Sequence, residues 1–253
     1  MKLRTLVAAA SLALAACTTT EVQQPGAKAD LKEAASLNTQ LGIDYMRSGQ
    51  MDLALEKLKR AVEQDPDLAV AHSTLALIYQ RKGDTELAEE HYRDALDINK
   101  NDPGTLNNFG VFLCGQGKIE DAEEAFVKAA KSTDNTVPAD AWANAGVCVR
   151  RDKKNPGRAE EYFRQALALN PRHSNALAQM AVVCFERKDY LRARAFLSRY
   201  EAVTKPSPEM LALGVRNERQ LGDQAAARSY ERRLRSDYPD AQVTYDLFKS
   251  GKP

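Results

Sequence analysis

The sequence predicts an all-α protein, built as a solenoid of about six helix-turn-helix repeats. Two observations lead to this prediction. Residues that favour helices, namely Ala, Leu, Glu, Lys and Arg, recur throughout the 253 residues, whereas runs of β-branched residues are scarce. A pattern of large and small residues also recurs every 34 residues, which suits a unit of two short helices joined by turns.

The first 16 residues have the three parts of a secretory signal peptide. Lys2 and Arg4 supply the basic start, and the apolar run that follows is shorter than the roughly 20 residues needed to span a bilayer. The stretch LAAC at residues 14–17 resembles the lipobox of bacterial lipoproteins. This resemblance implies cleavage before Cys17, a diacylglycerol on its sulfur and an acyl chain on its new amine. An ordinary cleavage site beside an incidental cysteine is the alternative.

The residues after the leader bear on where the protein acts. Thr18, rather than Asp, follows Cys17, which implies lipid anchoring in the outer membrane with the protein facing the periplasm. The chain has 36 basic and 35 acidic residues, and loss of the leader leaves a formal charge of about −1, so we expect no nucleic-acid partner. Residues 17–34 are polar and contain Pro25-Gly26, which predicts a flexible tether.

Each repeat is marked by a large residue followed by a small one. Leu41-Gly42, Leu75-Ala76 and Phe109-Gly110 are spaced by 34 residues, and Ala recurs at fixed positions in the second half of each unit. These positions resemble the tetratricopeptide repeat, which implies a right-handed superhelical solenoid. The predicted units are 35–68, 69–102, 103–136, 139–173, 174–206 and 207–240, followed by a tail or cap at 241–253.

Glycine has two predicted uses in these units. At position 8 of a unit, as at Gly42 and Gly146, a small residue lets the two helices approach closely. In the turn between the two helices, glycine tolerates the left-handed conformation that ends the first helix. The turn glycines are Gly49, Gly83, Gly117 and Gly222.

Three features depart from a strict repeat. Val137-Pro138 is a two-residue insertion between the third and fourth units, and the fourth unit has one extra residue near 154–156. The tail carries apolar residues that we expect to cover the open end of the last unit. These residues are Val243, Tyr245, Leu247 and Phe248.

No catalytic constellation is predicted. His72, His91 and His173 lie far apart in the sequence without metal-ligand spacing, so we interpret them as surface or packing residues and expect no metal site. No glycine-rich phosphate loop follows a strand, since no strand is predicted. We therefore expect no enzyme activity, no cofactor and no small-molecule substrate, and we assign function to the surfaces of the solenoid.

The concave face of a solenoid is its usual binding surface. In tetratricopeptide repeats, positions 2, 5, 9, 12 and 13 of the first helix face this groove, and here they are mostly apolar with a few amides. Such a strip suits an amphipathic or extended segment of another protein. Packing between repeats is the alternative role for these side chains. The predicted groove residues are Thr39, Ile43, Met46, Ser73, Leu77, Gln80, Asn107, Asn108 and Val111.

Three cysteines remain beside Cys17, which is an odd number for an exported protein. Cys114 has position 12 of its unit and Cys148 position 10 of the next, about 160° apart around a helix, so on neighbouring first helices they can face each other. We predict a disulfide that clips the third unit to the fourth. Cys184 is predicted to point inward. Three small buried apolar residues are the alternative.

The leader, the lipobox, the tether and the six repeats together resemble the type IV pilus biogenesis and stability lipoproteins of Gram-negative bacteria, the PilF/PilW family. Residues 45–80 and 106–126 carry the most specific resemblance, to the first three repeats of that family. The resemblance implies an outer-membrane pilotin that promotes assembly and stability of the secretin multimer through the groove of its early repeats. The alternative is a lipoprotein adaptor that recruits or regulates peptidoglycan enzymes or proteases.

Overall fold

The computed structural model describes residues 25–151 and 156–249, and within these ranges it contains thirteen helices. None of the helices in these ranges combines the length and apolar character needed to cross a membrane. The helices are α1 (Pro25–Arg47), α2 (Met51–Gln64), α3 (Ala69–Lys82), α4 (Thr85–Ile98), α5 (Pro103–Gly115), α6 (Ile119–Lys131), α7 (Pro138–Val149), α8 (Pro156–Leu169), α9 (Ser174–Glu186), α10 (Tyr190–Glu201), α11 (Pro208–Gln220), α12 (Gln224–Asp237) and α13 (Gln242–Lys249).

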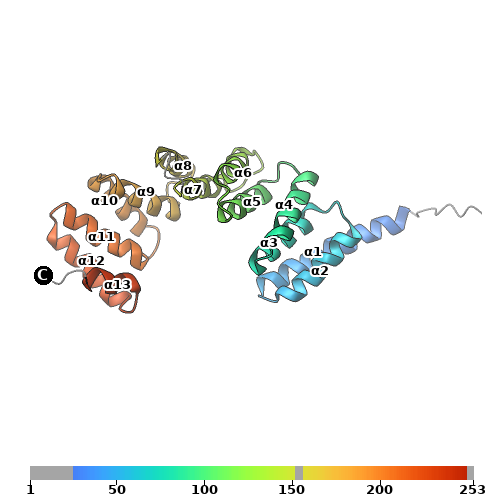
Figure 1. Cartoon of the computed structure of the whole chain (residues 1–253), viewed down its shortest axis with the longest axis horizontal. Coiled ribbons are helices and arrows are strands. Elements are labelled where there is room, and N and C mark those ends of the chain that lie inside the picture. Colours follow the sequence, from blue (N-terminus) through green and yellow to red (C-terminus); the bar gives the residue numbers. More distant parts are fainter. Residues whose placement is uncertain (1–24, 152–155, 250–253) are drawn as a thin grey trace, which may run out of the picture.

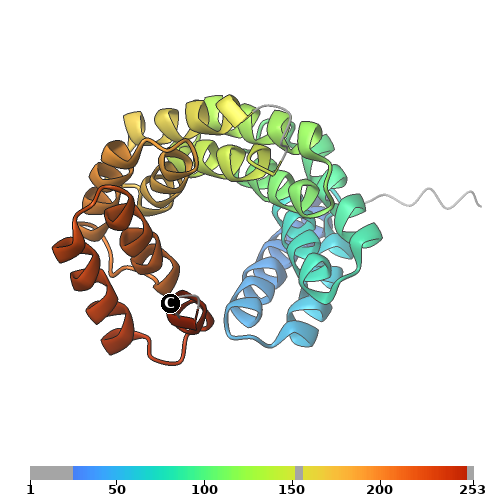
Figure 2. The same cartoon turned by 60° about the vertical axis from the view of Figure 1, so that its left-hand side comes forward.

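The helices form six antiparallel pairs that stack in sequence order (Figure 1). Each pair packs its two helices closely together, and the second helix of a pair then contacts the first helix of the next. Seen from another direction, the stack curls into an open ring with the first helices toward its inside and the second helices outside (Figure 2). This arrangement confirms the predicted all-α solenoid.

Glycine allows the predicted close approach in four of the six pairs, and alanine has the same position in the other two. A Cβ added at Gly146 would lie 2.5 Å from Cε1 of Phe163, and one at Gly110 would lie 2.8 Å from Cδ1 of Phe126. Because such distances are shorter than any real Cβ contact, only glycine fits there. The four turn glycines all have φ between +77° and +82°, as predicted, and Lys188 takes the left-handed conformation in the fifth unit.

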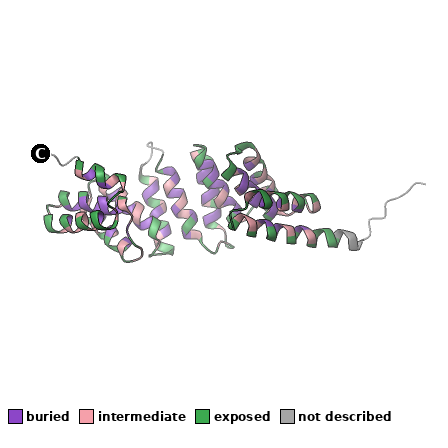
Figure 3. Cartoon of the chain, turned by 90° about the horizontal axis from the view of Figure 1, so that it is seen from below, coloured by how far each residue is buried: buried purple, intermediate pink, exposed green. Residues whose placement is uncertain are grey.

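The apolar core runs between the two layers of helices (Figure 3). At the same position of successive second helices, Tyr92, Phe126 and Phe163 are completely or almost completely buried against the small residues of the first helices. A buried Ala lies four residues before each of these rings. This alternation of large and small side chains fixes the distance between the helices of a pair.

The N-terminal tether prediction is wrong for residues 25–34, because α1 begins at Pro25 and continues into the first repeat. Proline is tolerated at the start of a helix, where its missing N–H has no partner to lose, and the alanine-rich residues that follow favour helix. Residues 29–33 of α1 are exposed, and this part of the helix projects beyond its neighbours (Figure 3). Cys17 lies outside the described residues, and so do 154 and 155 of the stretch 154–156 where the extra residue was predicted.

The last helix, α13, packs on α11 rather than starting a seventh pair. Leu247 is buried among Leu211, Val215 and Leu234, and Phe248 packs at the edge of the same cluster. The end of the array is therefore covered by apolar residues of the tail. Tyr245, which we expected to take part, is instead 47% exposed.

Candidate functional site

The predicted groove residues of the first three repeats lie on α1, α3 and α5, and all but one keep exposed surface. Val111 is the most open of them, at 43% exposure. Thr39 is the exception: it is buried, and its hydroxyl donates a hydrogen bond to the Ala35 carbonyl at 2.8 Å. Thr39 therefore cannot offer a surface to a partner, and its inclusion in the groove was wrong.

Two of the predicted groove amides also hold the fold together. The Asn107 side-chain oxygen accepts a hydrogen bond from Asn144 at 3.0 Å, across the junction between the third and fourth repeats. The Gln80 side-chain oxygen accepts one from the Tyr92 hydroxyl at 2.8 Å. Asn108 lies beside Asn107 in the wall of a cavity of about 200 Å³ that the Val137 insertion also lines. The apolar groove is thus flanked by amides that are already held in place.

The C-terminal helix shows what this groove can hold. Leu211 and Val215 have positions 5 and 9 of the sixth repeat, the positions that face the groove, and α13 buries both. Val111, at position 9 of the third repeat, has no such cover. The groove of the last repeat is therefore filled by an amphipathic helix of the same chain, whereas the groove of the early repeats is open.

The outer face of α1 is a second apolar surface. Leu31, Leu37 and Leu41 are 48%, 63% and 38% exposed and fall on one side of the helix. The residues equivalent to Leu41 in the next two repeats, Leu75 and Phe109, are buried against the preceding repeat. No repeat precedes the first one among the described residues, so this apolar surface of α1 stays uncovered.

The cysteine prediction is confirmed. Cys114 and Cys148 form a disulfide with 5.8 Å between their Cα atoms, and it joins α5 to α7. Arg151 reinforces the same junction, since its guanidinium donates a hydrogen bond to the Cys114 carbonyl at 2.9 Å. Cys184 is a buried free thiol, as predicted, and burial raises its pKa.

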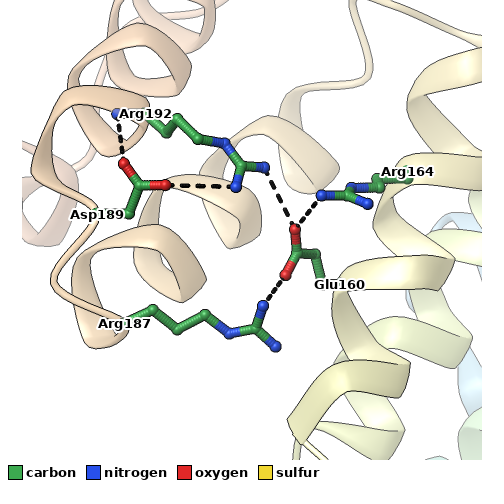
Figure 4. A network of polar contacts seen from close by, with 5 residues as sticks. All are labelled: Glu160, Arg164, Arg187, Asp189 and Arg192. Carbon is green, nitrogen blue, oxygen red and sulfur yellow. Dashed lines mark hydrogen bonds and ion pairs between the residues drawn. The ribbon is translucent and has the colours of Figure 1, made fainter.

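Sequence reasoning missed a set of buried carboxylates between repeats. Glu160, whose side chain is 8% exposed, accepts a hydrogen bond from Arg164 at 2.6 Å and contacts Arg192 of the next repeat at 3.3 Å (Figure 4). Arg187 pairs with its other oxygen. Glu123 has the equivalent position one repeat earlier. The sequence pattern that could have revealed these pairs is a glutamate at position 21 of one unit together with an arginine at position 19 of the next unit.

Sequence reasoning also separated two histidines that the structure brings together. Nδ1 of His72 lies 3.1 Å from Nδ1 of His91, although 19 residues separate them. His72 is on α3 and His91 on α4, so the helical pair itself places them side by side. Burial and the neighbouring His72 lower the pKa of His91. The expectation that the histidines lie apart was therefore wrong for this pair, and Asp94 lies beside both.

Comparisons with known proteins agree with this architecture. Tetratricopeptide-repeat family models match residues 33–101, 104–133 and 151–214. The chain is 31% identical to the type IV pilus assembly protein PilF of Pseudomonas aeruginosa over 249 residues, covering 98% of each protein. The chain belongs to the PilF family. The solved structure of Pseudomonas aeruginosa PilF covers 88% of this chain and all of its own, with 30% identity and a TM-score of 0.79.

A second solved member extends the likeness. PilW, described as a widely conserved type IV pilus biogenesis factor, matches with 27% identity and a TM-score of 0.76, covering 85% of this chain and 98% of its own. The match to PilF covers nearly the whole chain, so it extends past the repeats into the N-terminal region that holds Cys17. Membership of the PilF family thus concerns the full chain and not only its repeats.

Proposed function

We propose that this protein is an outer-membrane lipoprotein that acts in type IV pilus biogenesis by promoting assembly and stability of the secretin multimer. The observation that carries the proposal is the similarity to PilF over 98% of both chains, because PilF is named for type IV pilus assembly. The likeness to PilW, a type IV pilus biogenesis factor, supports the same process. In this proposal the lipid on Cys17 holds the protein at the membrane and the repeats bind the secretin.

The open groove of the first three repeats is the surface that we assign to the secretin. It exposes apolar side chains such as Ile43 and Val111, and the equivalent groove of the last repeat already accepts an amphipathic helix. A protein that binds the assembled ring more tightly than its free subunits stabilises the ring by mass action. No catalytic step is needed for this role.

Deleting the gene tests the function. We expect heat-stable secretin multimers and surface pili to be lost, and a plasmid copy to restore them. Intact multimers together with altered cell-wall hydrolysis would overturn the proposal and favour an adaptor for peptidoglycan enzymes or proteases. The plasmid copy also serves as the background for the substitutions below.

Val111→Glu tests the groove. Because Val111 is 43% exposed, a carboxylate can reach water there without unfolding α5, but it places charge on the apolar strip. Leu191→Glu is the matched control, since Leu191 is 68% exposed on the second helix of its repeat, away from the groove. We expect V111E to lose secretin multimers and L191E to keep them. Equal behaviour of the two variants would exclude the groove as the contact surface.

Cys17→Ala tests the anchor. We expect the variant to keep its fold, because Cys17 precedes every described helix, but to leave the outer-membrane fraction. Circular dichroism checks the fold and membrane fractionation checks the location. Normal fractionation of Cys17→Ala with the outer membrane would refute lipid anchoring without affecting the assignment of the groove.

A further inference from the structure

His72, His91 and Asp94 are brought together in the second repeat at a place that the groove does not include. His72 has position 4 of its repeat, whereas the groove positions are 2, 5, 9, 12 and 13. The side chains of His72 and His91 are 8% and 16% exposed, and that of Asp94 is 42% exposed. The cluster therefore has two enclosed imidazoles and one carboxylate that faces the solvent.

The three donor atoms have the spacing of ligands around one small ion. The two Nδ1 atoms are 3.1 Å apart, and Oδ2 of Asp94 lies 3.3 Å from that of His72 and 3.7 Å from that of His91. Neighbouring ligands of a tetrahedral ion with bonds of about 2.0 Å are separated by about 3.3 Å. A single ion can therefore reach all three atoms without a change of backbone.

The surroundings of His72 hold it in the form that binds a metal. Its Nε2 lies 3.1 Å from the carbonyl oxygen of Pro66, which can only accept a hydrogen bond. His72 therefore carries its proton on Nε2 and turns the lone pair of Nδ1 toward His91 and Asp94. A backbone carbonyl behind the ring is the usual outer partner of a metal-binding histidine, where it fixes both tautomer and orientation.

The position of His91 is also fixed. Its ring stacks on Tyr79 with 5.5 Å between centroids and an angle of 9° between the planes. Glu90 and Asp94 supply negative charge near the ring, against the positive charge of Lys59 on α2. His91 and Asp94 are three residues apart on α4, so they present their donor atoms on the same side of that helix.

We propose that His72, His91 and Asp94 form a zinc-binding site that joins α3 to α4. Two imidazole nitrogens and one carboxylate oxygen suit Zn²⁺, and three protein ligands leave a fourth position for water. In the metal-free protein, one of the two facing Nδ1 atoms must carry a proton to make their 3.1 Å contact. The lone pair of Nδ1 on His72 accepts this hydrogen bond, so the proton belongs to His91. When Zn²⁺ binds, the proton of the neutral His91 ring moves from Nδ1 to Nε2 by exchange with solvent, with no net release, and two metal–nitrogen bonds replace the hydrogen bond.

The test is titration of the purified full-length protein with ZnCl₂, followed by isothermal calorimetry. We expect one Zn²⁺ per chain with a dissociation constant in the micromolar range. His91→Asn and Asp94→Asn are expected to weaken binding at least about tenfold, since each removes one of three ligands. Both residues have exposed surface, so these variants are preferable to substitutions of the buried His72.

Two controls make the result specific. His173→Asn changes another histidine that contacts a carboxylate, Asp140, at 2.8 Å, and asparagine can still cap α9. Cys184→Ser removes the free thiol. Both variants should bind Zn²⁺ as the parent does. Zinc affinity that H91N and D94N leave unchanged, or no binding by the folded protein at millimolar Zn²⁺, would overturn the proposal. The outcome is independent of the secretin, since it is measured on the protein alone.

Discussion

The junction between the third and fourth repeats is built differently from the junction between the second and third, although both use the same repeat positions. At the former, Glu123 is buried and pairs with Arg158 and the Tyr162 hydroxyl of the next repeat. At the latter, the residue equivalent to Glu123 is Glu89, whose side chain is 25% exposed and pairs with Lys118 at 2.8 Å. A disulfide closes only the first of these two junctions.

The difference between the two junctions comes from two repeat positions at which the third and fourth repeats carry different residues. Position 19 is Arg158 in the fourth repeat but Asp121 in the third, and position 23 is Tyr162 in the fourth but Ala125 in the third. With an aspartate and an alanine there, an open cavity of about 450 Å³ remains beside α4. The second and third repeats are therefore joined less firmly than the third and fourth, and we expect local opening to need less free energy at this junction.

Removing the disulfide is expected to have the largest effect on this comparison. Cys114→Ser together with Cys148→Ser releases a loop of 34 residues, which the chain-entropy relation values at about 3–4 kcal/mol of unfolding free energy. Urea unfolding of the parent, the double variant and the parent in reductant measures the loss. Reductant should destabilise the parent and leave the double variant unchanged. A parent that is indifferent to reductant would show that the disulfide does not constrain the junction.

The paired carboxylates come next in expected size. Glu123→Gln removes the charge from a side chain that is 8% exposed, so we expect the free energy of unfolding to fall by about 2 kcal/mol. A fully buried pair would lose more, but the partner Arg158 is 42% exposed and solvent screens the pair. Glu89→Gln is the matched substitution at the other junction and should cost less than about 0.5 kcal/mol. Thermal unfolding of the two variants checks the order. Equal losses would mean that burial does not distinguish the junctions.

The repeat framework was predictable from the sequence because it depends on residues that recur with a fixed period. The close approach at Gly146, the left-handed turn at Gly83 and the pairing of Cys114 with Cys148 all followed from position within a repeat. The disulfide joins α5 to α7, and its prediction needed only the positions of the two cysteines around the first helices of adjacent repeats. Local periodicity is enough to specify all three features.

The contacts that sequence reasoning missed also join two helices, but no position of the tetratricopeptide pattern marks them. Glu123 and Tyr162 look like ordinary surface residues of amphipathic helices until the stacking of repeats buries Glu123 and places the Tyr162 hydroxyl against it. His72 and His91 meet because α3 and α4 are antiparallel, and no short motif records that distance. Thr39 failed for the opposite reason, because the groove pattern does not tell which side chains turn back onto their own helix.

Copying residues of the junction between the third and fourth repeats into the junction between the second and third should raise the free energy of unfolding by a smaller amount. Asp121→Arg with Ala125→Tyr copies the residues of positions 19 and 23 from the fourth repeat into the third. Both positions line the open cavity, and we expect the new arginine to reach Glu89 as Arg158 reaches Glu123. We expect a gain of about 1 kcal/mol from the buried ring area and the new ion pair. Hydrogen exchange should slow in α4 and α5. Asp121→Arg alone is the control, and faster exchange in the double variant would contradict the comparison.

The pH dependence of Tyr162 gives the smallest expected effect. Burial, followed by its hydrogen bond to Glu123, raises the pKa of Tyr162 to about 12. Between pH 10 and pH 12 the folded protein therefore keeps a proton that the unfolded chain has lost, so the stabilising contribution is complete below pH 10 and decreases as the pH rises. The ring is partly exposed, so solvent screening limits the loss to a few tenths of a kcal/mol per pH unit.

Tyr162→Phe isolates this contribution. Tyr92 and Tyr230 also have raised pKa values, mainly because of burial, so the alkaline loss of stability in the parent is a sum over several tyrosines. The difference between the parent and Y162F removes the other tyrosines from the comparison. We expect Y162F to have a lower free energy of unfolding than the parent at pH 8, as measured by urea unfolding. The gap between the two free energies should narrow above pH 10. A gap that is constant from pH 8 to pH 11 would mean that the Tyr162 proton is not held by the junction with Glu123.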